Sequence, residues 1–459
     1  MLRVLGGTDR PSQKPQDVAD SSHALVRDGV LAGLLDFNAG SGRGAANAPS
    51  PPDPAQRVYR RWLGLRRVLC VADPTLAGRI LRNDDGAWSE RQSAFSRRCP
   101  QEDVSVFLQP AFDSDALRGY VDAAAPMFER AVAAWTTQRD LELDTVGREL
   151  FACVAANTLM GVTDTADALR LARAARVLRA GNGAWLRRQW FGPTGWRARR
   201  TYRTLFVRFR AEVDSRRVSD APDLLSRMCQ GAVGGDSSAD DALVRTFLAL
   251  MSDAFDGASD GVTRMAYVLA THPVWQERLQ TEAILTTLGR PSYDALATMP
   301  RHDQAWTETL RCRPMMPTLF RVAHVDTEVG GLHIEKGALV AVRLSAALRD
   351  PNFWHAPDTF DPDRFNRKRV GVRPNLEGFV PFGIGPYAPW AERFCALQAK
   401  VFWHAFGTRA RMRLASGYDS DQNPLYGEPP EGALHVVVEA LVPREPQDEG
   451  GARVSAVVP

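Results

Sequence analysis

The sequence predicts a mainly α-helical protein with small β-sheets, and three patterns along the chain carry that prediction. Apolar residues recur at helical spacing through 115–290, most clearly in 241–271. Residues 318–345 alternate between apolar and polar types in short segments, which predicts strands. Residues 391–410 predict a last helix, and a pair of strands follows it. The helical face of 241–271 carries Val244, Phe247, Leu248 and Met251.

The chain divides into a leader and one expected domain. Residues 1–55 predict a flexible leader, because 38–54 is rich in Gly, Ala and Pro. We expect 56–459 to form a single domain. It opens with a hairpin at 62–72, after which Asp73-Pro74 begins a helix.

Prolines mark the ends of the later helices. His272-Pro273 ends the helix of 241–271 and begins the next one. A further helix spans 302–313, and Pro314 and Pro317 terminate it.

Composition and charge exclude several functions. The net charge of +3 does not suggest a nucleic-acid-binding protein. The 6 cysteines are scattered without C-x-x-C spacing, so we expect neither a metal site nor a disulfide framework. No run of 18 apolar residues is present, and we expect no membrane span and a cytoplasmic location. Arginine supplies nearly all the positive charge, which is typical of a GC-rich bacterial genome.

An ordered series of motifs occupies the C-terminal half. Glu308 and Arg311 form an E-x-x-R pair, which one helical turn places on the same face. Arg349-Asp350-Pro351 and Phe360-Asp-Pro-Asp-Arg364-Phe365 follow, and then Phe379-Val-Pro-Phe-Gly383-Ile-Gly385. This order resembles the cytochrome P450 family over roughly 57–445. The resemblance implies a cytochrome P450-like fold whose core is locked by Glu308, Arg311 and Arg364.

The haem-binding loop departs from the family pattern P-F-G-x-G-x-R-x-C-x-G. Aligned from Phe382, the position of the haem-ligating cysteine holds Pro389. Tyr387 replaces the preceding arginine and Ala391 the following glycine. Cys395 lies six residues beyond the ligand position, and we expect it to pack in the core.

Other positions that the resemblance links to haem and oxygen have also changed. The stretch 100–112 carries two acids and no base where the family holds the haem propionates. Asp256 is retained in the long central helix, but Gly257 replaces the threonine that relays protons. Arg321 matches a retained propionate-binding arginine. We therefore expect no cofactor, and no conventional P450 monooxygenase reaction, because thiolate donation drives O–O cleavage in this family.

Three functional hypotheses remain open. The first is a helper protein in bacterial secondary-metabolite or antibiotic biosynthesis, similar to the P450 homologues that activate glycosyltransferases, with a glycosyltransferase or other pathway enzyme as partner. The second is an enzyme that catalyses cyclisation, isomerisation or dehydration of a hydrophobic small molecule, with Asp256 as acid–base group. The third is an oxidoreductase with atypical haem ligation.

Two further motifs need an interpretation. Gly257-Ala-Ser259-Asp-Gly261 matches G-x-S-x-G, but it lies in a helical pattern, so we expect its glycines to open or kink the helix. Segment 185–210 is rich in arginine and tryptophan. We expect it to form a surface for a partner or an acidic ligand, with Arg197, Arg199 and Arg200 at its centre.

Overall fold

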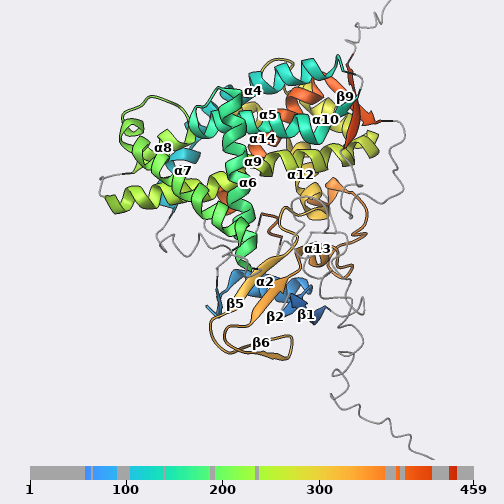
Figure 1. Ribbon diagram of the computed structural model, residues 1–459. Coiled ribbons are helices and arrows are strands. Elements are labelled where there is room, and N and C mark those ends of the chain that lie inside the picture. The colour runs from blue at the N-terminus through green and yellow to red at the C-terminus, as the bar shows by residue number, and fades with distance from the viewer. Residues whose placement is uncertain are drawn as a thin grey trace, which may run out of the picture.

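The computed structural model describes residues 57–63, 66–89, 104–138, 140–186, 192–232, 237–366, 379–382, 388–415 and 434–441. The predicted fold class is confirmed, because helices make up most of this part of the chain and the strands form small sheets. Figure 1 shows most helices gathered in one body and the largest sheet at one end of it. The predicted leader, 1–55, lies outside the described residues. None of the described helices is both long enough and apolar enough to cross a membrane.

The helices follow the sequence patterns closely. The long central helix α9 spans Ser237–Thr271, and α10 begins at Pro273, after one intervening residue. Asp73 caps the start of α2, where its side chain accepts a hydrogen bond from the backbone N–H of Leu76. The helical elements are α2 (Pro74–Arg82), α3 (Ser105–Leu108), η3 (Pro110–Phe112), α4 (Ser114–Trp135), α5 (Leu143–Met160), α6 (Thr165–Leu186), α7 (Pro193–Arg217), α8 (Leu224–Gly231), α9, α10 (Pro273–Thr286), α11 (Tyr293–Ala297), α12 (Pro300–Cys312), α13 (Leu344–Ala347), η5 (Pro362–Phe365) and α14 (Ala388–Gly407).

The strands form three sheets in the described residues. The largest has the order β1-β2-β8-β5-β3, in which β2 and β8 run parallel and the other pairs are antiparallel. A second has the order β4-β10-β9, and β6 pairs with β7. The strands are β1 (Val58–Leu63), β2 (Arg66–Val71), β3 (Trp88–Ser89), β4 (Leu141–Glu142), β5 (Leu319–Ala323), β6 (Thr327–Val329), β7 (Leu332–Ile334), β8 (Leu339–Val342), β9 (Ala410–Leu414) and β10 (His435–Ala440).

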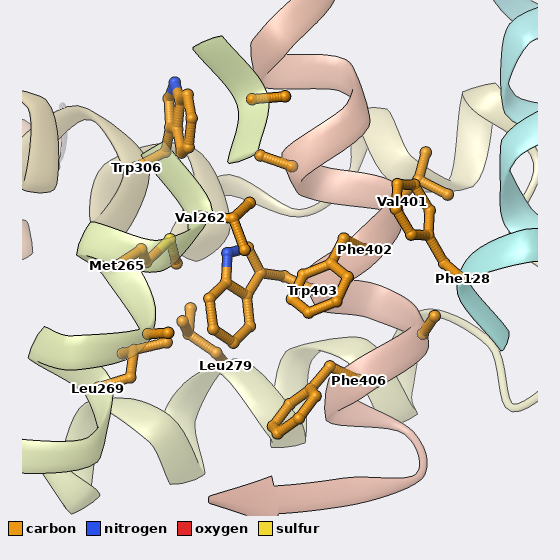
Figure 2. Packing of buried hydrophobic residues seen from close by; sticks show 14 of the residues in the cluster. Phe128, Val262, Met265, Leu269, Leu279, Trp306, Val401, Phe402, Trp403 and Phe406 are labelled. Carbon is orange, nitrogen blue, oxygen red and sulfur yellow. The ribbon is translucent and has the colours of Figure 1, made fainter. Parts of the chain in front are cut away.

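Aromatic side chains of α14 form the centre of the helical core. Figure 2 shows the aromatic residues Phe402, Trp403 and Phe406 of α14 with apolar residues of α9 on one side and Phe128 of α4 on the other. Close packing depends on Gly261 of α9, because a β-carbon there would collide with the ring of Trp306 from α12. The helices α9, α12 and α14 are thereby held in one rigid arrangement.

A buried ion triad connects α12 to the chain that precedes α14. Glu308 accepts hydrogen bonds from Arg311 Nε at 2.8 Å and from Arg364 Nε at 3.0 Å. Arg311 also donates to the carbonyl oxygens of Leu348 at 2.9 Å and Pro357 at 2.8 Å. Each charge is paired and hydrogen-bonded, which is the condition under which buried ions are tolerated.

We predict that Arg311→Ala lowers the free energy of unfolding by about 3–5 kcal/mol, because it leaves the buried Glu308 carboxylate with one arginine instead of two. Arg118→Ala is the control, since the ion pairs that Arg118 forms with Asp115 and Asp294 are exposed, and its loss should cost about 1 kcal/mol or less. Urea denaturation followed by circular dichroism measures both values. Equal losses in the two variants would show that the triad does not stabilise the fold as described.

Candidate functional site

The start of α14 contains Pro389, which the motif alignment from Phe382 predicts at the position of the family's cysteine. Pro389 lies in the first turn of the helix and is exposed, while Ala391 is buried. Proline fits this turn because the first N–H groups of a helix have no partner within it. Its side chain has no atom that can bind a metal. Tyr387, with Gly383 and Gly385, lies outside the described residues.

Cys395 lies in the core between α14 and α9. Its side chain is fully buried, and a β-carbon added to Gly257 of α9 would lie 2.8 Å from its sulfur. The expected packing role of Cys395 therefore agrees with its position. Burial raises the pKa of the Cys395 thiol, and the charge of Asp253 raises it further, so the sulfur stays a neutral thiol at physiological pH.

The contact explains why a glycine occupies position 257. A β-carbon there, including that of the threonine in the family motif, would overlap the sulfur of Cys395 unless the cysteine side chain or one of the helices moved. The helix α9 runs unbroken through Gly257 and Gly261, so these glycines do not open it, and the expected kink stays a prediction. They serve close helix packing instead. The Ser259 motif lies in the same helix and not in a strand–turn–helix elbow.

We predict that Gly257→Ala destabilises the protein by about 1–3 kcal/mol, because overpacking against Cys395 outweighs the gain of about 1 kcal/mol in helix propensity. In a Cys395→Ala background the same substitution should be neutral or stabilising. Thermal unfolding of the four proteins of this double-mutant cycle measures the coupling.

Gly147 provides a matched control for this cycle. It lies inside α5, and a β-carbon there would meet nothing within 4 Å. Gly147→Ala should therefore stabilise by up to about 1 kcal/mol. If Gly257→Ala destabilises the wild type and the Cys395→Ala variant by the same amount, the proposed contact is contradicted.

Three carboxylates lie along one face of α9 beside Gly257. They are Asp253, Asp256 and Asp260, spaced by three and four residues, which is one helical stripe. Arg179 of α6 faces them, with Nη1 at 3.6 Å from Asp256 Oδ2 and 3.7 Å from Asp260 Oδ2. These distances are too long for strong hydrogen bonds, so one arginine is shared loosely between two carboxylates.

The surroundings of Asp256 favour its protonated form. Its residue surface is only 7% exposed. Burial raises the pKa of Asp256, and the neighbouring Asp260 raises it further, while Arg179 partly opposes both effects. The pKa of Asp253 is also raised by burial. The raised pKa makes Asp256 a candidate proton donor at a higher pH than an ordinary aspartic acid.

We predict that infrared difference spectra between the wild type and Asp256→Asn show a carboxyl group titrating with a midpoint above the ordinary value of 3.8. The difference spectrum between the wild type and Asp115→Asn, which alters an exposed carboxylate on α4, is the control. A rate that depends on protonated Asp256 should fall as pH rises through this midpoint. A midpoint at or below 3.8 would remove Asp256 as a general acid.

The remaining residues that the sequence singled out lie on other elements or outside the described residues. Arg321 is fully buried in β5, and its Nη1 donates to the carbonyl oxygen of Phe320 at 3.0 Å. Arg197 and Arg200 are exposed on α7, whereas Arg199 is half-buried. The acids Glu102 and Asp103, and residues 187–191 of the arginine-rich segment, lie outside the described residues.

Sequence reasoning missed Arg179. It lies on α6, far from α9 in the chain, and no local pattern marks it among the many arginines of this sequence. The stripe of Asp253, Asp256 and Asp260 could have been found, because its spacing is visible within the predicted helix. Only the tertiary packing of α6 on α9 shows which cation faces the stripe.

Comparison with known proteins gives a consistent result. The cytochrome P450 family model matches residues 197–406. Cytochrome P450 136 of Mycobacterium tuberculosis is 28% identical over 314 residues, which cover 67% of this chain and 64% of that protein. The match thus spans slightly less than two thirds of that relative. Cytochrome P450 3A19 of Capra hircus aegagrus is 36% identical over 150 residues, 32% of this chain and 68% of that protein.

Solved structures agree on the fold. The retinoic acid-bound cyanobacterial CYP120A1 superposes with a TM-score of 0.68, covering 84% of this chain and 92% of that chain. Its sequence identity is 18%, so this likeness concerns the fold alone.

These matches correct the expectation that the protein has no cofactor. The family model and the relatives point to haem as the cofactor. That expectation came from the altered haem loop, which bears on the iron ligand and not on the whole cofactor. The described residues at the start of α14 do not fit the thiolate ligation of the family, because Pro389 has no donor atom and the Cys395 thiol is buried against α9.

Proposed function

This chain belongs to the cytochrome P450 family, and we propose that it acts on a hydrophobic small molecule by a redox-neutral reaction instead of thiolate-dependent monooxygenation. The contact between Cys395 and Gly257 carries the proposal. It supports the view that the sulfur of α14 serves helix packing. Oxygen activation in this family depends on a thiolate that donates electron density to iron. At the start of α14 Pro389 has no donor atom, and the sulfur of Cys395 lies in the contact with α9.

We assign proton transfer in this reaction to Asp256. A carboxyl group with a raised pKa can donate its proton to a substrate oxygen or double bond and then recover a proton from a neighbouring carbon. The exchange is balanced without external electrons, as an isomerisation, cyclisation or dehydration requires. Arg179, 3.6 Å from Asp256, stabilises the carboxylate that remains after the proton has left.

A second candidate function is that of a helper protein for another enzyme of a biosynthetic pathway, such as a glycosyltransferase. Exposed arginines in the first half of α7 favour it, because arginine and tryptophan are enriched in binding hot spots. The two functions make different demands on the chain. The enzyme needs Asp256, whereas the helper needs the surface of α7.

We predict that the reduced, haem-loaded protein forms a carbon monoxide complex without the Soret position of a thiolate ligand. An ordinary monooxygenase of this family would show the thiolate position, and finding it here would overturn the proposal. The variants Cys395→Ser and Cys99→Ser would then identify the ligand, because only the ligating cysteine abolishes the band when replaced. Cys99 lies outside the described residues, so it is included in the test.

A further inference from the structure

The arginines of α7 fall into two groups. In the second half of the helix, Arg210 contacts Asp240 and Asp241 of α9, and Arg217 contacts Asp214 and Asp240. Arg216 pairs with Glu212 and Asp223, and Arg208 pairs with Glu212. These arginines hold α7 against α8 and α9. Their charges are already compensated within the fold.

The first half of α7 presents a different surface. Within the described part of the chain, no carboxylate lies at ion-pair distance from Arg197, Arg200 or Arg203. All three side chains are exposed. The guanidinium of Arg200 lies 5.6 Å from the ring centroid of Trp196, in a cation–π arrangement.

Two apolar residues accompany these arginines. Trp196 is 54% exposed and Val207 is 68% exposed. Residues 196, 200, 203 and 207 are spaced by four, three and four, so their side chains form one line along the helix. We call Trp196, Arg197, Arg200, Arg203 and Val207 the α7 stripe.

The helix behind the stripe is fixed in place. Its inner face buries a row of residues at helical spacing, and the close approach of Ala198 to Gly181 leaves no room for a β-carbon on α6. The stripe is therefore a preorganised surface, and a partner that binds it loses little free energy to ordering the helix. The buried row consists of Gly195, Ala198, Tyr202, Leu205, Phe209 and Val213.

We propose that the α7 stripe docks an acidic protein surface that carries an apolar side chain for Trp196. The three guanidinium groups, which pair with no carboxylate among the described residues, match carboxylates of a partner, which they can bind through paired hydrogen bonds. A membrane fits less well, because interfacial helices bury a continuous apolar face and the stripe offers only Trp196 and Val207. This inference rests on the second candidate function and names the partner chemistry of that surface.

Fluorescein-labelled poly-L-glutamate is the probe, titrated into the full-length protein at low ionic strength. Arg197→Glu/Arg200→Glu/Arg203→Glu should weaken binding by about tenfold or more, since each exposed pair contributes up to about 1 kcal/mol. The control reverses three exposed arginines remote from α7, namely Arg60, Arg67 and Arg79. It changes the net charge equally and should weaken binding by about twofold or less.

Three outcomes would overturn the proposal. They are no binding by the wild type, equal weakening by the two triple variants, and tighter binding to phosphatidylserine vesicles than to the peptide. Trp196→Ala should weaken binding to a glutamate peptide containing leucine more than to poly-L-glutamate. The triple reversal on α7 should leave the fold intact, since its three arginines form no ion pair in the described structure. Thermal unfolding of the variant checks this expectation.

The test is independent of the proposed reaction. A thiolate-type carbon monoxide spectrum with normal peptide binding would refute the redox-neutral reaction and leave the docking surface standing. A non-thiolate spectrum without peptide binding would refute the docking surface and leave the redox-neutral reaction standing.

Discussion

The contact between Gly257 of α9 and Cys395 of α14 fixes the relation between the two central helices. A β-carbon at position 257 would lie 2.8 Å from the sulfur, so the glycine and the cysteine require one another in this packing. The contact keeps the thiol out of solvent and neutral. Asp256, the neighbour of Gly257 in the chain, meets Arg179 of α6 beside this contact. The state of the sulfur and the position of the acid thus follow from one packing arrangement.

Charge is distributed unevenly over the helices around this contact. Between α6 and α9, Arg179 is shared by two carboxylates, and burial leaves Asp256 with a raised pKa. On the outer side of α7 the imbalance is reversed, because Arg197, Arg200 and Arg203 face solvent without carboxylates in the described structure. An interior acid suits proton transfer, and an exterior cationic surface suits an acidic partner. One helical body can therefore support chemistry inside and recognition outside.

Much of the fold could be predicted because local patterns determine it. The apolar spacing of 241–271 and the prolines at 273 and 314 mark helices that the structure contains. The pairing of Glu308 with Arg311 follows from one helical turn, whereas the hydrogen bond of Arg364 with Glu308 could be anticipated only from the family resemblance. The site was harder to predict. The contact of Arg179 with Asp256 depends on how α6 crosses α9, and the half-burial of Arg199 depends on how α7 rotates. The prediction of no cofactor was wrong, because a change at the position expected for the iron ligand concerns the iron and not the cofactor as a whole.

The central claim is that the sulfur of Cys395 belongs to the helix interface and not to iron. X-ray absorption at the iron edge of the haem-loaded protein tests it most directly, because the technique distinguishes a sulfur ligand from nitrogen or oxygen. We predict an iron coordination shell without sulfur, unchanged in Cys395→Ala. An iron–sulfur distance in the wild type that disappears in Cys395→Ala would contradict the account.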